Sequence, residues 1–224
     1  MTTLDSHRKN SLTAGILYLL TFVSIPTLSL YGPVHDANYI TSSASDTPIL
    51  IGGILEIIVA LTGIGTAVAL YPVLKKQNEG MALGLVSSRV LEAATIFAGV
   101  MFLLTVVTFH QSAASAEAAV TSRTLVTMYD RMFLIGQSFM PAINDLLLGF
   151  LLYHSRLVPR GLSLIGIIGG PVLLMGTFSV LFGLIGQREP LAALSAVPVA
   201  VFEFSLGIYL VVKGFKPTDG TPSN

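Results

Sequence analysis

Six long apolar runs, separated by short polar stretches, are the feature that most limits what this chain can fold into. The runs cover residues 11–31, 49–74, 81–109, 124–153, 162–185 and 190–212. Each is long enough to cross a bilayer core of about 30 Å, because a helix rises about 1.5 Å per residue. We therefore predict an all-α, polytopic integral membrane bundle of six transmembrane helices.

The composition agrees with a membrane domain and excludes several other classes of protein. Only 11% of the residues are charged, whereas a soluble domain carries about 25%. The formal net charge is zero, which gives no support for nucleic-acid binding, so the lipid bilayer is the expected partner. The chain has no cysteine, which rules out a disulfide, a thiol nucleophile and a zinc–thiolate site.

The polar stretches predict how the domain is organised. Residues 1–10 form a cytoplasmic tail, residues 11–213 the membrane domain, and residues 214–224 a disordered cytoplasmic tail. Pro26 is expected to bend the outer end of the first span. Between the third and fourth runs, the alanine- and serine-rich residues 110–123 predict a short surface helix.

Arginine and lysine residues predict the orientation, because they collect on the cytoplasmic side of a membrane protein. With six spans both termini share one side. That side would hold Arg8, Lys9, Lys75, Lys76, Arg156, Arg160, Lys213 and Lys216. The opposite side holds Arg123 and Arg188, with Arg131 close to it. We therefore predict a multi-pass protein of the cell inner (plasma) membrane with both termini in the cytoplasm.

Polar and ionisable residues inside the apolar runs predict where a functional site lies. They are Glu56, Arg89, Glu92, Asn144, Asp145 and Glu203. Such groups are costly in lipid and face a bundle interior or a water-filled cavity. The second, third, fourth and sixth runs carry them, so we expect these four spans to build one polar site near the midplane. Four acids and one arginine carry an excess of negative charge, so either some acids are protonated, or a cation or cationic ligand is bound, or water reaches them.

Two interpretations of these residues remain open. In a structural one, Arg89 pairs with Asp145 or Glu203 and locks the bundle, so Arg89→Leu misfolds the protein. In a functional one, the residues line a binding or translocation site, so Glu92→Gln folds but loses its activity.

Glycines and prolines give a second, weaker signal. The spacing of Gly166 and Gly170 predicts close helix packing. Gly170 followed by Pro171 is alternatively a hinge, and Pro141 is expected to leave a backbone carbonyl unpaired near Asp145.

Three function classes fit this pattern. The first is a small-molecule or ion binding protein, most simply a proton- or cation-coupled carrier, in which Arg89 pairs with an acid or an anionic ligand group. The second is an intramembrane enzyme acting on a lipid or isoprenoid substrate, with the acids as proton donors. The third is a non-catalytic membrane partner subunit. Six spans are few for a carrier, which favours a homodimer or a partner protein. All four histidines fall in tails or connections, so we expect no resident metal or cofactor.

Several stretches also carry a family resemblance. They are residues 15–21 (GILYLLT), 66–75 (TAVALYPVLK), 88–93 (SRVLEA), 144–153 (NDLLLGFLLY), 155–160 (SRLVPR) and 202–210 (FEFSLGIYL). Together they resemble an uncharacterised bacterial membrane-protein family, the domain of unknown function 4386 family. The resemblance extends over nearly the whole chain. It implies a multi-span bacterial inner-membrane protein and brings no activity, ligand or catalytic residue.

Overall fold

The computed structural model describes residues 3–112 and 115–216, with side chains from Ser6 onward. Within these ranges the chain is helical and contains no strand. Six helices are long and apolar enough to cross a membrane, so the prediction of an all-α bundle of six membrane-spanning helices is confirmed. Residues 1–2 of the predicted first tail and residues 217–224 of the predicted disordered tail lie outside the described residues.

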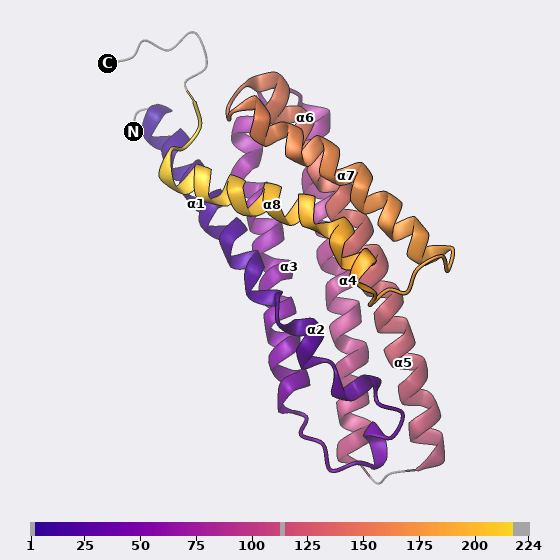
Figure 1. Ribbon diagram of the computed structural model, residues 1–224. Helices are drawn as coiled ribbons and strands as arrows, with labels where there is room; N and C mark the ends of the chain where they lie inside the picture. The colour runs from indigo at the N-terminus through magenta and orange to yellow at the C-terminus, as the bar shows by residue number, and fades with distance from the viewer. Residues whose placement is uncertain (1–2, 113–114, 217–224) are drawn as a thin grey trace.

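The first span is interrupted near its far end. It consists of α1 (Thr3–Thr21), the 3-10 turn η1 (Phe22–Ser24) and α2 (Thr27–Leu30). Pro26 stands directly before α2, and its fixed φ and missing N–H group suit a helix start better than a helix interior. We call the end of the bundle where α1 begins the inner end, and the opposite end the outer end (Figure 1).

Two long helices follow, α3 (Thr47–Leu74) and α4 (Glu79–Gln111), and they pack side by side. The turn between them ends at Asn78, whose side chain accepts a hydrogen bond from the N–H of Met81 at 2.9 Å and caps α4. α4 has 33 residues and is therefore about 50 Å long. It is longer than a bilayer core of about 30 Å requires.

The fourth span differs from the prediction, because it is part of a continuous helical rod of 40 residues. The rod consists of α5 (Ala116–Leu134), the π-helical turn η4 (Ile135–Phe139) and α6 (Met140–Ser155). The prediction of a separate surface helix over residues 110–123 is wrong, since α4 continues to Gln111 and α5 begins at Ala116. Ser115 caps α5 by accepting a hydrogen bond from the N–H of Ala118 at 3.1 Å, and alanine favours the helix that follows.

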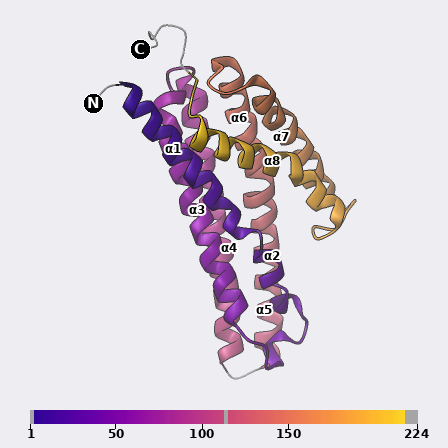
Figure 2. The ribbon, with the colours of Figure 1, turned by 60° about the vertical axis from the view of Figure 1, so that its left-hand side comes forward.

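The last two spans, α7 (Arg160–Leu181) and α8 (Pro190–Val212), have 22 and 23 residues, the length of a single crossing. α7 ends four residues before the predicted boundary, where Gly183 adopts a φ of 71°. Both helices lie in the inner half of the bundle, whereas α3, α4 and α5 continue to the outer end (Figures 1 and 2).

In the inner half the spans form a closed ring, in which each helix packs against two neighbours. The order around the ring is α1, α3, α4, α6, α7 and α8, and α8 packs against α1 again. Arg8 links α1 to α8, because its guanidinium donates to the carbonyl oxygens of Leu210 and Val211 at 3.1 and 2.7 Å. These carbonyls belong to the last turn of α8, where helical partners are missing.

Glycines let neighbouring helices of the ring approach closely. A Cβ atom at Gly166 would lie 2.7 Å from the ring of Phe202 in α8, and one at Gly170 would lie 2.8 Å from the carbonyl oxygen of Ala142 in α6. The close packing that the spacing of the two glycines predicts is therefore confirmed. Both positions exclude larger side chains.

The outer end is covered by the polar loop before α3. Its two 3-10 turns are η2 (Pro33–His35) and η3 (Tyr39–Thr41). They bury Val34 and Ile40 in a hydrophobic cluster with Val106 of α4 and Val126 of α5. The loop is therefore packed onto the ends of the long helices (Figure 2).

A hydrogen-bonded group fastens this loop to α4, and we call it the outer lock: Tyr39, Asp46, His110 and Gln111. Oδ1 of Asp46 accepts from the hydroxyl of Tyr39 and lies 2.6 Å from Nδ1 of His110. Its Oδ2 accepts from Nε2 of Gln111 at 2.9 Å. Burial by itself would raise the pKa of Asp46, but the hydrogen bonds from Tyr39, Gln111 and His110 outweigh burial and leave the pKa lowered.

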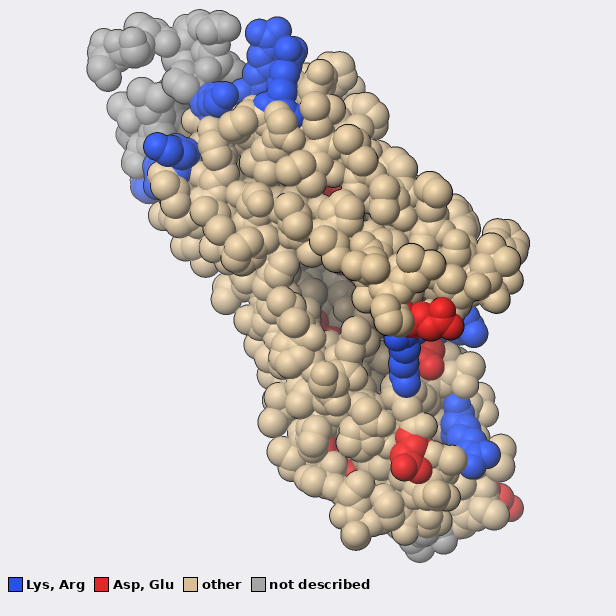
Figure 3. Space-filling view, in the orientation of Figure 1, with Lys and Arg blue, Asp and Glu red and all other residues tan. Residues whose placement is uncertain are grey.

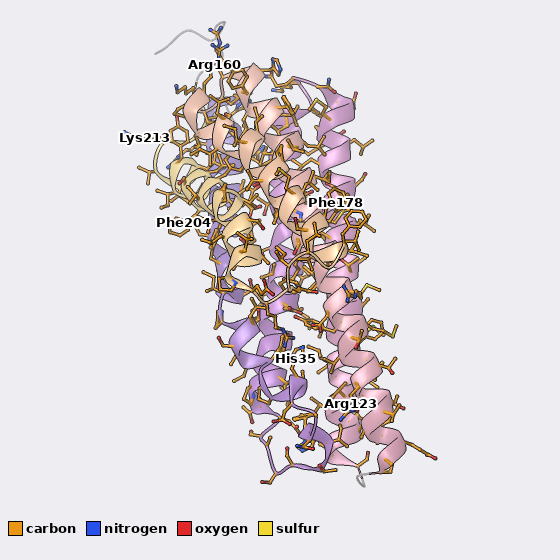
Figure 4. The ribbon with its side chains drawn as sticks, turned by 45° about the vertical axis from the view of Figure 1, so that its right-hand side comes forward. His35, Arg123, Arg160, Phe178, Phe204 and Lys213 are labelled. Carbon is orange, nitrogen blue, oxygen red and sulfur yellow. The ribbon has the colours of Figure 1, made fainter. Side chains whose placement is uncertain are left out.

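Basic side chains gather at the inner end (Figure 3). Figure 4 shows Arg160 and Lys213 at this end and Arg123 near the other. The two ends of the bundle thus differ in charge. They also differ in the helices that reach them, because α7 and α8 lie in the inner half (Figure 1).

Candidate functional site

The six candidate residues fall into two groups at different heights in the bundle. We define the inner cluster as Tyr18, Ser88, Arg89, Glu92, Asn144, Asp145 and Glu203, and the outer cluster as Tyr31, Glu56, Tyr129 and Gln137. A Cβ atom on Gly63 would lie 3.9 Å from the side chain of Arg89, which places the inner cluster at the height of Gly63 in α3. Glu56 precedes Gly63 by two helical turns, a rise of about 10 Å. Five of the six candidates are therefore brought together, and Glu56 lies apart from them.

Arg89 joins three spans at a position that is only 4% exposed. Its Nη1 donates to Oε2 of Glu92, one turn along α4, at 3.0 Å, and its Nη2 donates to Oε1 of Glu203 in α8. The guanidinium also lies over the ring of Tyr18 in α1, 5.7 Å from the ring centroid. The acids and the aromatic face compensate a buried cation that lipid would reject.

Asn144 extends the inner cluster into α6. Its Nδ2 donates to Oε2 of Glu92 at 2.6 Å, and its Oδ1 accepts from the hydroxyl of Ser88. Oε2 of Glu92 thus accepts from both Arg89 and Asn144. Such charge-assisted bonds hold the glutamate in one position.

Asp145 is the exception in the inner cluster. It is 0% exposed, and neither carboxyl oxygen has a hydrogen-bond partner among the described residues. The charged groups that act on it electrostatically are Glu203, Arg89 and Glu92. An ionised carboxylate without hydrogen bonds is costly in an apolar interior. The position is therefore suited to a carboxyl group that holds a proton or faces a bound cation.

The outer cluster surrounds Glu56, which is also 0% exposed. Its Oε1 accepts from the hydroxyl of Tyr129 at 2.8 Å and from Nε2 of Gln137 at 3.0 Å. Its Oε2 has no hydrogen-bond partner among the described residues, and neither has the hydroxyl of Tyr31. The charge of Glu56 acts on the phenol of Tyr31, which belongs to the same cluster.

The π-helical turn η4 brings Gln137 into the outer cluster. A π turn holds more residues than an α-helical turn, so it changes which residues share a face before and after it. Pro141 follows the turn and has no N–H group to donate to the carbonyl of Gln137, four residues earlier. The carbonyl that Pro141 leaves without its α-helical partner therefore belongs to the outer cluster and not to the surroundings of Asp145.

A cavity of about 590 Å³ opens beside the outer cluster. Four segments line it: the turn after α2, the junction of α5 with η4, the outer half of α7, and the start of α8 with the loop before it. Tyr31, Tyr129, Phe133 and Gln137 form the wall next to Glu56, while small apolar residues such as Ala192 stand opposite. The space-filling view shows the molecule hollowed at this height (Figure 3).

Charged side chains close one side of this cavity around Asp130. Oδ1 of Asp130 lies 3.2 Å from Nε2 of His35 and accepts from Nη2 of Arg188 at 3.2 Å. The backbone carbonyl of Asp130 accepts from Nε2 of Gln187 at 2.9 Å. Figure 4 shows His35 lying between the long helices, near the middle of the molecule. These contacts hold the turn after α2 and the loop before α8 against α5.

Sequence reasoning missed five residues of the two clusters: Tyr18, Ser88, Tyr31, Tyr129 and Gln137. Tyrosine and glutamine are common at the ends of spans, so neither type marks a site by itself. Pro141 is the sequence signal for the irregular turn, but it does not show that Gln137 meets Glu56. Among the described residues, no group of three or more histidines and acids is arranged to hold a metal ion.

A family model described as Domain of unknown function (DUF4386) matches residues 13–214 of the chain. The match covers both clusters, the second to sixth spans and the first span from residue 13 onward. No curated protein and no solved structure matches the chain. Its function has therefore to be inferred from the geometry of the two clusters.

Proposed function

We propose that this chain, which belongs to the DUF4386 family, is a membrane carrier that couples the movement of a small molecule or ion to protons or cations. The family description assigns no activity. The coupling site in this proposal is the inner cluster, where ionisable groups from several spans meet near the middle of the bundle. Intramembrane ionisable groups of this kind commonly form proton relays and ion pathways.

One observation carries the proposal: Asp145 is buried without a hydrogen-bond partner, next to an arginine that already pairs with two glutamates. Three carboxyl groups face one guanidinium, so the cluster has an excess of two negative charges when all four groups are ionised. A buried site does not hold this excess unless a proton or a cation neutralises it. A purely structural network would instead satisfy all of its members.

Arg89 is the residue that can link such an occupant to the shape of the bundle. It pairs with Glu92 inside its own helix and with Glu203 in α8, so only the second pair joins two spans. A proton or cation that neutralises Glu203 weakens this attraction and leaves Arg89 able to turn toward Asp145. α8 is the least buried of the six spans: only 22% of its most apolar stretch is buried inside the bundle. We therefore propose that α8 moves when Arg89 exchanges Glu203 for Asp145.

We also propose an orientation for the protein in its membrane. The basic side chains of the inner end, among them Arg160 and Lys213, give that end the charge of a cytoplasmic face. We therefore place the inner end, with both termini, in the cytoplasm, and the protein in the inner (plasma) membrane.

The test uses Asp145→Asn in proteoliposomes, with Asp36→Asn in the exposed loop as the matched control. A pH-sensitive dye inside the vesicles reports proton movement after an acid step, with and without sodium outside. Infrared difference spectra report the carbonyl stretch of a protonated carboxylic acid. We expect proton or sodium-dependent flux from the native protein and from Asp36→Asn, and a fall of at least about tenfold in Asp145→Asn. If protons are the occupant, the carboxylic-acid band is lost as well.

Two outcomes would overturn the proposal. One is equal flux from Asp145→Asn and the native protein. The other is the absence of any flux from the native protein, together with spectra that do not change with pH or sodium. Chemical turnover of the membrane lipid in the same vesicles would point to an intramembrane enzyme instead.

A further inference from the structure

Two buried polar groups next to the cavity at the outer cluster have no hydrogen-bond partner among the described residues. Oε2 of Glu56 and the hydroxyl of Tyr31 are both buried without a partner, and Tyr31 lines the cavity. Gln137 lines it too, and because its Nε2 donates to Glu56, its Oε1 is left as an acceptor. Oε2 of Glu56 and Oε1 of Gln137 can each accept a further hydrogen bond, so a group that brings several donors suits this side of the cavity.

The charges around the cavity favour a positive group. Glu56 stands directly behind the wall formed by Tyr129 and Gln137, to which it is hydrogen-bonded. Arg188, which also lines the cavity, pairs with Asp130, so its charge is already compensated. A cation near Glu56 would gain an ion-pair partner in a poorly solvated place, while an anion there would be repelled.

The remaining lining gives the expected ligand its size and its apolar part. The rings of Tyr31 and Tyr129 meet edge to face, with 5.3 Å between their centroids, and Phe133 lies beside Tyr129. Aromatic faces attract organic cations. The opposite wall is built from small or aliphatic residues such as Leu173, Val180 and Ala192. A volume of about 590 Å³ falls within the range of small-molecule sites, about 300–1,000 Å³.

We propose that this cavity binds lipophilic primary amines, with the ammonium group between Tyr31, Tyr129 and Gln137 and the apolar part against α7 and α8. An ammonium group supplies three donors and a positive charge, which suit the carboxylate of Glu56 and the acceptor oxygens around it. The inference names a substrate class for the carrier proposed above and rests on that function for its meaning in transport. Binding itself can be measured without transport.

The test compares three probes of nearly the same shape: 4-phenylbutylamine, 4-phenylbutanol and 4-phenylbutanoic acid. Binding to the purified, full-length protein in nanodiscs is measured by calorimetry, with empty nanodiscs subtracted. We expect saturable binding of the amine, at least about tenfold tighter than the alcohol, and none of the acid. Glu56→Gln should weaken amine binding by about tenfold or more and leave alcohol binding unchanged. Glu117→Gln, an exposed matched control, should change neither.

A second variant tests the cavity independently, in case Glu56→Gln does not fold. Ala192→Phe adds volume inside the cavity and touches no charge, so it should abolish binding of the amine and the alcohol alike. The inference is overturned if the amine binds no tighter than the alcohol, or if Ala192→Phe and Glu56→Gln both bind the amine normally.

The same measurements separate this inference from the carrier function. Amine binding that depends on Glu56, without proton or sodium flux in vesicles and with spectra that do not change with pH or sodium, would support the cavity site and contradict the carrier. Flux that depends on Asp145, without preference for the amine, would support the carrier and contradict the cavity site.

Discussion

The inner cluster and the outer lock both enclose ionisable side chains, but they differ in how completely those side chains are satisfied. In the outer lock, each carboxyl oxygen of Asp46 has a hydrogen-bonding neighbour, and both ring nitrogens of His110 face an acceptor. In the inner cluster, Arg89 and Glu92 both have hydrogen-bond partners, while Asp145 has none among the described residues.

A network whose members are all satisfied stabilises one arrangement, which is what a loop fastened to a helix end requires. In the carrier that we propose, the inner cluster instead changes its occupancy: an unsatisfied acid and an excess of negative charge would give it more than one arrangement, depending on protons or cations. Under this proposal, the same residue type, aspartate, serves both purposes, and its partners decide which.

The largest effect on stability is expected when Arg89 is removed from the inner cluster. Arg89→Leu leaves Glu92 and Glu203 buried without their cation, so we expect the protein to lose about 3–5 kcal/mol of stability or to fail to fold. Equilibrium unfolding in detergent measures the loss. Arg123→Leu, at an exposed position, is the matched control. Adding Glu203→Gln to Arg89→Leu should restore part of the stability, and a double variant no more stable than the single one would argue against the pairing.

A smaller effect is expected when the outer lock is opened by acid. The pKa of Asp46 is lowered in the folded protein, so its contribution to stability is complete above about pH 4, the ordinary aspartate pKa, and is lost as the pH falls through the lowered pKa. The lost hydrogen bonds correspond to about 1–3 kcal/mol. Cleavage of the loop next to Tyr39 by pepsin, measured at decreasing pH, should rise in this window.

Asp46→Asn should imitate the acid effect at neutral pH and make Tyr39 accessible to chymotrypsin. Proton or cation flux should stay at the native level in this variant, since the outer lock lies outside the inner cluster. A loop that stays protected in Asp46→Asn would show that the apolar contacts of Val34 and Ile40 hold it by themselves.

The smallest effect on stability is expected at Asp145. Asn has nearly the same volume and no charge, so Asp145→Asn should leave the free energy of unfolding within about 1 kcal/mol of the native value, or raise it. The same variant should lose the proton or cation flux described above. Thermal unfolding of the two proteins at neutral pH measures the first part. A large loss of stability in Asp145→Asn would place Asp145 with the outer lock, as a structural residue.

The number and position of the spans could be predicted because each depends on local composition. The run 190–212 coincides with α8 (Pro190–Val212), and the run 49–74 ends with α3 at Leu74. The fourth span could not be bounded in this way. Its first residues, 116–123, follow the cap Ser115 and are helical outside the apolar run, and hydrophobicity does not report on that part.

The candidate site was predictable in part for the same reason. Arg89 and Glu92 lie three residues apart on one helix, so their contact follows from helix geometry alone. The partnership of Arg89 with Glu203 spans more than a hundred residues and requires α4 and α8 to meet. The sequence could not show that Glu56 lies outside the inner cluster. Its height in the bundle depends on where α3 begins, and its partners come from α5 and η4.

By itself, then, the sequence determined that this protein crosses a membrane six times and which side chains lipid excludes, because both depend on the transfer of individual residues from water to an apolar phase. Only the tertiary structure decided that the excluded groups form two clusters, that Asp145 has no hydrogen-bond partner among the described residues, and that a cavity lies beside Glu56. Those properties depend on which helices are neighbours and at what height they meet. Hydrophobicity, which acts equally on every apolar face, does not specify either.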